Sequence, residues 1–262
     1  MKSLAAETKA LQIINDAIAH AVQSTGGAIT IACGRFTETG ITHAQKGLGK
    51  DKADFILMAD TSPKLYISHK ATGFCWNGYG SGGKKAFEHR SPYRDKKIWE
   101  FAKWAANYCV KHQETRMVKE GIFEWTGAER GVWCFPPASV QNLIVYGPKF
   151  GESYGPFNCH IAAVGEPIIK NCGECFRLSF MGGVESNGDI PKEGDEPIIS
   201  IGGRIGAQIN TYLTDEKTGF HGWLGFFPYR LIEKSQKNRD ASRKRRGKGD
   251  GLVKVDWPPE LG

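Results

Sequence analysis

Two side chains of opposite charge are spaced so that they could do chemistry together. Asp54 stands near the start of the apolar run 53–59, and Lys70 closes the run 64–70. The turn-forming segment 60–63 separates the runs, which are therefore predicted to be antiparallel strands of one hairpin. This pairing sets Asp54 across from Lys70, where side chains share one face and their Cβ atoms lie ~5 Å apart. A carboxylate and an ammonium at a strand end can bind a divalent cation and stabilise charge on a scissile phosphate.

Hydrophobic spacing predicts the elements that flank this hairpin. Apolar residues recur at helical intervals over 4–22, and the short apolar run 28–33 is expected to be a strand. The hairpin pairing also sets Ile56 across from Ser68. A second helix is expected over 96–118. The first part of the chain is therefore predicted to follow the order helix, three strands, helix.

The second half of the chain has a different sequence pattern. It consists of short β-like segments separated by Gly and Pro. These segments are 131–135, 140–146, 160–164, 175–180 and 197–201. A basic run follows, because residues 234–248 hold eight Lys or Arg side chains and one acid, Asp240. The sequence thus predicts an α+β protein with a core over 1–125, a β-rich elaboration over 126–233 and a basic flexible tail over 234–262.

Composition sets broad limits on the class of protein. The chain has 262 residues, of which 40% are hydrophobic and 24% are charged, as in ordinary soluble globular proteins. A formal net charge of +7 favours a polyanionic partner. No apolar run reaches the ~20 residues of a membrane span, and residues 1–7 lack the apolar core of a signal peptide, so no membrane partner is expected. Seven cysteines spread along the chain argue against a disulfide framework and favour a reducing cytoplasm.

The hairpin in its surroundings resembles the PD-(D/E)xK nuclease superfamily, whose core is restriction-endonuclease-like. In that family a strand-borne Asp and a following (Asp or Glu)-x-Lys tripeptide hold one or two Mg²⁺ ions and orient the attacking water. Asp54 and the tripeptide 68–70 match those positions, within a resemblance that covers roughly residues 1–120. Two positions depart from the motif, because Ala53 replaces Pro and Ser68 stands where the second carboxylate belongs. A neutral hydroxyl is a weaker ligand for a hard cation, so the departure counts against two-metal chemistry and leaves one-metal chemistry open.

The resemblance implies a role for each residue of the motif. Asp54 would be a ligand of Mg²⁺ or Mn²⁺, and the backbone carbonyl of His69 would be a second ligand. Ser68 occupies the first position of the catalytic tripeptide. Lys70 would lie near the attacking water or the phosphate and stabilise the transition state electrostatically.

Such a site needs one more carboxylate. Several families of the superfamily place a Glu on the first helix, and Glu7 stands at the similar position. Glu38 and Asp60 are the alternatives, with Asp60 ranked last because the turn lies at the far end of the hairpin from Lys70. The structural alternative for the whole group is an exposed Asp–Lys pair on a surface hairpin, which contributes at most ~1 kcal/mol and does no chemistry.

Wider strings of the sequence are similar to those of uncharacterised phage-encoded proteins that carry a KAD…ISHK signature. Residues 49–54 and 66–70 hold the signature, and the regions 195–197 to 227–229 resemble the second half of the same proteins. The resemblance implies a phage origin and action in the cytoplasm of the host cell.

Cations that could contact a nucleic-acid backbone flank the motif and recur near the C-terminus. They are Lys50, Lys52, Lys84, Lys85, Arg204, Arg243, Lys244, Arg245 and Arg246. Each such contact adds to the salt dependence of binding without reading the base sequence. The alternative interpretation is that these are ordinary surface side chains, the last four in a solvated tail.

Two further motifs are weaker. The Gly-rich stretch 78–85 lacks the Gly-Lys-Ser/Thr ending of a phosphate-binding loop, which argues against an NTPase and favours a lid or linker. Cys172 and Cys175 form a single Cys-x-x-Cys pair, with Cys159 or His160 upstream. A structural zinc site usually has two such pairs, so zinc is not expected.

The sequence therefore predicts a Mg²⁺-dependent endonuclease that hydrolyses phosphodiester bonds of DNA, alone or as a homodimer. Two alternatives stay open. Because Ser68 replaces an acid, the protein could be a catalytically inactive module that binds nucleic acid. It could also be a structural or assembly protein of a phage particle, in which the hairpin is scaffolding.

Overall fold

The chain folds into two compact units. The computed structural model describes residues 2–48, 52–71, 77–79, 100, 104, 115–119, 122–125, 131–147, 152–188, 205–215, 219–228 and 253–261. Unit 1 combines Met1–Gly73 with Asn142–Ile201, and unit 2 combines Phe74–Gln141 with Gly202–Gly262. The units thus differ from the three consecutive segments that the sequence predicts, because each unit draws on two separate stretches. The described residues mix helices with strands, as expected for an α+β protein.

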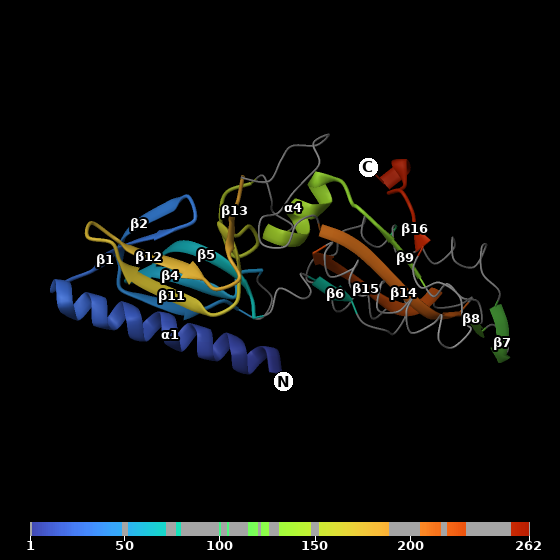
Figure 1. The fold of residues 1–262 in the computed structure, drawn as a ribbon, viewed down its shortest axis with the longest axis horizontal. Coiled ribbons are helices and arrows are strands. Elements are labelled where there is room, and N and C mark those ends of the chain that lie inside the picture. Colours follow the sequence, from blue (N-terminus) through green and yellow to red (C-terminus); the bar gives the residue numbers. More distant parts are fainter. Residues whose placement is uncertain are drawn as a thin grey trace. The chain divides into compact units, whose positions relative to one another are not determined.

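Unit 1 contains the long helix α1 and the strands of two sheets (Figure 1). Its elements are α1 (Lys2–Thr25), β1 (Ile29–Cys33), β2 (Phe36–Ile41), β3 (His43–Lys46), β4 (Phe55–Ala59), β5 (Ser62–Lys70), β10 (Ile161–Val164), β11 (Pro167–Asn171), β12 (Phe176–Phe180) and β13 (Val184–Ser186). The four-stranded sheet has the order β11-β12-β1-β2, and the five-stranded sheet has the order β13-β10-β5-β4-β3. In the five-stranded sheet β10 is parallel to β5, and the other neighbours are antiparallel.

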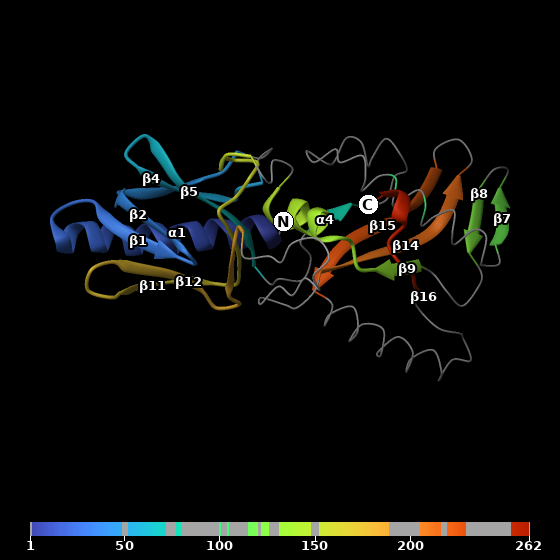
Figure 2. The ribbon, with the colours of Figure 1, turned by 90° about the horizontal axis from the view of Figure 1, so that it is seen from above.

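The helix α1 confirms the helix expected over 4–22 and extends it at both ends. Its buried side chains recur every three or four residues and so lie on one face: Ala10, Ile14, Ile18 and Ala21. Gly26 follows the helix with a φ of 74°, which glycine adopts without the strain that a Cβ would cause. Seen from above, α1 runs along the middle of unit 1, with β4–β5 to one side and β11–β12 to the other (Figure 2), while Figure 1 shows that it lies below the strands of both sheets.

A side chain of α1 also closes one edge of the five-stranded sheet. Asn15 Nδ2 donates to Ala44 O at 2.9 Å, and Asn15 Oδ1 accepts from Ala44 N at 2.8 Å. Ala44 belongs to β3, the outermost strand, whose outward backbone groups would otherwise be open to pairing with another chain.

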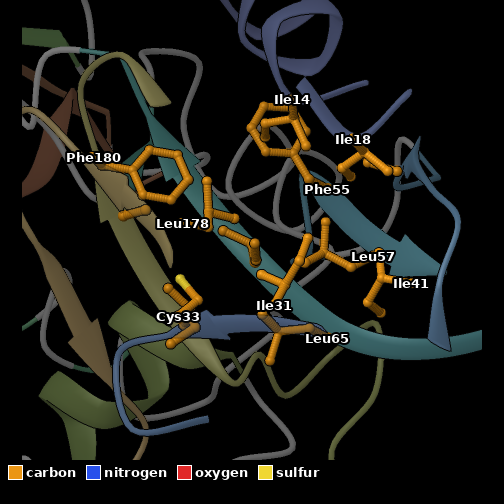
Figure 3. Packing of buried hydrophobic residues seen from close by; sticks show 14 of the residues in the cluster. Ile14, Ile18, Ile31, Cys33, Ile41, Phe55, Leu57, Leu65, Leu178 and Phe180 are labelled. Atoms are coloured by element: carbon orange, nitrogen blue, oxygen red, sulfur yellow. The ribbon is translucent and has the colours of Figure 1, made fainter. Parts of the chain in front are cut away.

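The core of unit 1 lies between α1 and the two sheets. Its buried side chains come from α1, from the five strands β1 to β5, and from β10 and β12. Figure 3 shows members of this cluster from different elements gathered together, among them Ile14, Phe55, Leu57 and Leu178. Segments from the two separate stretches of the chain therefore share one core.

The predicted hairpin is present as β4 and β5, with a shorter turn than expected. Asp60 and Thr61 form the turn, whereas the sequence predicts 60–63. Asp60 has a φ of 50°, in the left-handed region that Asp tolerates better than most residues. The shorter turn changes which residues face one another.

The register of the hairpin differs from the predicted one by an even number of residues. Ile56 lies opposite Tyr66, whereas the sequence predicts Ser68 as its partner. Because side chains alternate between faces with a period of two, a shift of two residues leaves each on its predicted face. Asp54, Ser68 and Lys70 thus stay on one face although the predicted pairing is wrong.

Unit 2 is built on a seven-stranded sheet. Its strands are β6 (Asn77–Tyr79), β7 (Thr115–Lys119), β8 (Ile122–Trp125), β9 (Gly131–Cys134), β14 (Ile205–Asp215), β15 (Gly219–Pro228) and β16 (Val253–Lys254). Five of them follow the order β16-β9-β14-β15-β6, while β8 pairs with both β14 and β7. The short helix η1 (Pro259–Leu261) follows. Among the described residues, none of the helices combines the length and the apolar character needed to cross a bilayer.

Two predicted elements are wrong at described positions. The helix expected over 96–118 does not extend to its predicted end, because β7 is a strand paired with β8. The segment 140–146 is not β-like but belongs to the helix α4 (Ala138–Tyr146). The strands expected over 131–135, 160–164 and 175–180 are confirmed as β9, β10 and β12, while 197–201 and the basic run 234–248 lie outside the described residues.

Candidate active site

Asp54 and Lys70 lie side by side at the open end of the hairpin. Asp54 immediately precedes β4, and Lys70 is the last residue of β5. Lys70 Nζ is 3.9 Å from Asp54 Oδ2, and the two side chains are 26% and 21% exposed. The structure thus brings the two predicted groups together, with both partly open to solvent.

The backbone of the tripeptide orients the Asp54 carboxylate. Asp54 Oδ2 accepts a hydrogen bond of 2.6 Å from His69 N, and Asp54 N donates to Ile67 O at 2.8 Å. An ionised acceptor makes such a bond shorter and stronger than a neutral one. The other oxygen, Asp54 Oδ1, makes no hydrogen bond within the described part of the chain and is the atom left for a ligand.

The His69 side chain belongs to the core and lies on the opposite face of β5. Its ring is buried and packs against Phe55 and Phe180, with centroids 5.0 and 5.7 Å apart. Its Nε2 donates to Gly165 O at 2.8 Å, which places the proton of a neutral ring on Nε2. Burial lowers the pKa of His69, and the bond to Gly165 and the charge of Asp54 partly offset this. A metal ligand from His69 would therefore be its backbone carbonyl, as the resemblance implies.

Ser68 is fully buried on the face that carries Asp54 and Lys70. Its Oγ makes no hydrogen bond within the described residues. Its neighbour on β10 is Ala162, whose side chain has no hydrogen-bonding group. Buried hydroxyls are normally paired, so the unpaired Ser68 hydroxyl is an exception to this rule.

The three acids considered as additional ligands lie in different places. Glu7 is on α1, and its charge raises the pKa of His69, so it acts electrostatically on the tripeptide. Glu38 belongs to β2 in the four-stranded sheet, and Asp60 lies in the turn at the other end of the hairpin. Of the three, Glu7 is the one whose charge reaches the tripeptide, but it acts on the His69 ring, on the face of β5 opposite Asp54 and Lys70.

Glu185 is an acid that the sequence reasoning missed. Ala162 lies beside Ser68 of β5 and opposite Glu185 of β13, so the three side chains share one face. The spacing of strands puts Glu185 about 10 Å from Ser68 along this row. Glu185 is buried. No local signal marks it, because the pairings that bring it here join segments far apart in the sequence.

The donor groups present fit one hydrated cation better than a closed cage. Within the described residues no group of three or more His, Cys, Asp or Glu side chains could hold a metal ion. Mg²⁺ keeps several of its waters and is commonly bound through one or two carboxylates. The Asp54 carboxylate fits that mode of binding, and the fully buried Ser68 hydroxyl lies on the same face of the hairpin.

Lys52 is not the surface cation that the sequence predicts. It is 4% exposed, and its Nζ donates a hydrogen bond of 2.8 Å to Ile144 O in the last turn of α4. The final carbonyls of a helix lack partners within the helix and carry partial negative charge, so an ammonium there stabilises the helix end. The other predicted backbone contacts, Lys50, Lys84, Lys85, Arg204, Arg243, Lys244, Arg245 and Arg246, lie outside the described residues.

The cysteines considered for zinc lie in separate places within unit 1. Cys172 and Cys175 form the turn between β11 and β12, where Cys172 N donates to Cys175 O at 2.9 Å. Cys159 is buried in a cluster with Ile56 and Met58 of the five-stranded sheet. All three thiols are free.

Comparison of the chain with protein-family models, with curated proteins and with solved structures finds no match. The case for a function therefore comes from the geometry of the site.

Proposed function

We propose that this protein is a Mg²⁺-dependent endonuclease that hydrolyses phosphodiester bonds of DNA. One observation carries the proposal: the Asp54 carboxylate, oriented by the His69 amide, lies 3.9 Å from the Lys70 ammonium at a strand end where solvent reaches both. Phosphoryl transfer is catalysed mainly by positioning and by stabilising negative charge. A carboxylate that can hold a cation beside an ammonium supplies both.

Each group has one task in this proposal. Asp54 would hold the cation through Oδ1, and Mg²⁺ bound there supplies positive charge and a water of lowered pKa. The His69 amide keeps the carboxylate from rotating. Lys70 is placed by Asp54, and its N–H donors stabilise the negative charge that develops on the phosphate oxygens.

Part of the order of elements in unit 1 supports the restriction-endonuclease-like core that the resemblance implies. The first of the three predicted strands departs from it, because β1 lies in the four-stranded sheet and β3 takes its place beside β4. α1 comes first, the antiparallel strands β3, β4 and β5 follow after β1 and β2, and α4 leads to β10. β10 then pairs with β5 in parallel, directly beside the tripeptide.

A plasmid-nicking assay tests the proposal. Wild type should nick with Mg²⁺ or Mn²⁺ and stop in the presence of EDTA. Asp54→Asn and Lys70→Met should each lower the nicking rate by about 100-fold, the usual cost of removing one electrostatic group from a transition state. Circular dichroism and a gel shift should find both variants folded and still bound to DNA.

Matched control variants come from the other end of the same hairpin. Asp60→Asn and Lys64→Met remove one acid and one lysine from the hairpin without touching its open end. Both controls should nick at the wild-type rate. Unchanged nicking in Asp54→Asn and Lys70→Met would refute the assignment.

The inactive binding module is the second candidate, because Ser68 supplies a buried hydroxyl in place of an acid. This candidate is favoured if the purified protein binds DNA with salt-sensitive affinity and nicks with none of the divalent cations. Affinity that barely responds to salt would favour the assembly protein instead.

A further inference from the structure

Aromatic rings gather beside the candidate active site. Tyr66 of β5, His160 and Tyr154 lie nearly parallel: the Tyr66 and His160 rings are 5.8 Å apart at 4°, and the His160 and Tyr154 rings are 4.0 Å apart at 20°. Phe36 stands edge-on to this series, 5.4 Å from Tyr154 and 4.9 Å from His160. We call these four side chains the ring stack.

The ring stack ends in an exposed tyrosine with a cation beside it. Tyr154 is 39% exposed, whereas His160 beneath it is 7% exposed. Arg35 lies 5.1 Å above the Phe36 ring, and its Nη2 donates to Tyr154 Oη at 3.3 Å. Within the described residues, the Tyr154 ring contacts no other ring than those of Phe36 and His160, so no further ring covers its outer face.

The loop that carries Tyr154, residues 152–158, is held in place by buried amides. Asn158 is 2% exposed, and its Oδ1 accepts from Asn187 Nδ2 at 2.8 Å. Pro156 O accepts from the backbone of Ala53 at 3.0 Å. A ring presented by a fixed loop loses little conformational entropy on binding, so Tyr154 is a ready contact surface.

Two connections place the ring stack next to the candidate active site. Tyr66 precedes Lys70 by four residues on the same face of β5, a distance of ~13 Å along a strand. The bond from Ala53 to Pro156 fixes the loop directly before Asp54. A polymer that meets Tyr154 is therefore within reach of Asp54 and Lys70.

We propose that the ring stack is a platform for an unpaired base, so that the substrate of the candidate active site is a single strand or an unpaired stretch of nucleic acid. The link to cleavage rests on the proposed function. Every base has a π face, so stacking on Tyr154 is independent of sequence, and the neighbouring Arg35 adds a cation that fits an anionic polymer. A paired base within a duplex has both faces covered by its neighbours and cannot stack on the ring.

Two fluorescent oligonucleotides separate stacking from attraction to phosphates. One is an oligothymidylate of about 12 nucleotides, within the range that such sites cover, and the other has the same backbone without bases. Wild type should bind the oligothymidylate about 10-fold more tightly than the abasic strand in fluorescence anisotropy with EDTA. Tyr154→Ala should remove that preference, and Tyr154→Phe, which keeps the ring, should retain it.

Phe157→Ala is the matched control, because Phe157 is the other exposed aromatic residue of the loop and lies outside the ring stack. It should keep the preference for bases. Equal binding of both strands by wild type, or an unchanged preference in Tyr154→Ala, would overturn the inference. EDTA prevents metal-dependent cleavage during the binding measurement, so binding and cleavage are tested separately. A protein that shows the preference but, with Mg²⁺ or Mn²⁺, cleaves neither plasmid nor single-stranded DNA would support the platform and refute the proposed function.

Discussion

Ser68 carries a fully buried hydroxyl that makes no hydrogen bond to the described residues. Burying an unpaired hydroxyl costs free energy, so removing it should be neutral or stabilising. Ser68→Ala should leave the free energy of unfolding unchanged or raise it by up to about 1 kcal/mol in urea unfolding, while the nicking rate falls.

The opposite result would assign Ser68 a structural role. If Ser68→Ala loses more than about 1 kcal/mol of stability and nicks normally, the hydroxyl is paired in the folded protein and takes no part in the reaction. Ser62→Ala is the matched control, because Ser62 is the exposed serine at the other end of β5. It should change neither quantity.

At the residue scale, the Asp54–Lys70 pair could be predicted from the sequence because side chains alternate along strands. The alternation survives the error in register, since the pairing is shifted by two residues and not by one. Glu185 and the ring stack could not be predicted in this way. Tyr154 and His160 meet Tyr66 through folding of a distant loop, and nothing in the local pattern of either segment indicates the other.

At the scale of elements, Lys52 ties the strand region to α4. Its stem is buried and its ammonium donates to Ile144 O at the helix end. Lys52→Met keeps most of the buried stem and loses the charged donor, which leaves a helix carbonyl without this partner. The variant should lose about 1–3 kcal/mol in its free energy of unfolding, the usual value of a hydrogen bond to a charged group.

Lys46→Met serves as the control for Lys52→Met. Lys46 is an exposed lysine of β3, and its replacement should change the free energy of unfolding by no more than about 0.5 kcal/mol. Equal stability of the two variants would mean that the buried ammonium contributes nothing net to the fold.

The elements themselves were predictable where their burial is one-sided. α1 buries one face, and its spacing predicts the helix. In α4 nearly every residue is buried, so the alternation of apolar and polar positions that marks a helix is missing and its β-branched residues favour a strand. The burial of Lys52 could not be predicted from the local sequence, because its hydrogen-bond partner Ile144 lies in a helix 92 residues away.

At the scale of the whole molecule, unit 1 is assembled from two stretches that unit 2 separates in the sequence. The core takes side chains from α1 to β5 and again from β10 and β12. A domain boundary predicted from the change in composition misses this arrangement. The second stretch joins unit 1 because β10 pairs in parallel with β5, which is distant from it in the sequence. The predicted domains are consecutive segments of the chain, whereas each observed unit combines two separate segments whose strands share sheets.

The free energy of unfolding of unit 1 should depend on pH, because folding buries the side chain of His160. Burial lowers the pKa of His160 to about 4, and its Nδ1 accepts a hydrogen bond from Tyr66 N at 3.1 Å, which only an unprotonated nitrogen can do. A histidine of the unfolded chain has a pKa of about 6.5. Between these values the unfolded state binds a proton that the folded state does not. The free energy of unfolding should therefore fall as the pH falls below about 6.5, by at most about 3 kcal/mol near pH 4.

His160→Asn isolates this contribution, because its Oδ1 can replace Nδ1 as the acceptor for Tyr66 N and the amide does not titrate. Urea unfolding between about pH 5 and 6.5, above the range in which most carboxylates titrate, should give a flatter pH dependence for this variant than for wild type. His20→Asn alters an exposed histidine of α1 and should keep the wild-type slope. The same slope in His160→Asn and wild type would mean that the buried ring takes up its proton without unfolding, and that the Tyr66 bond does not hold it neutral.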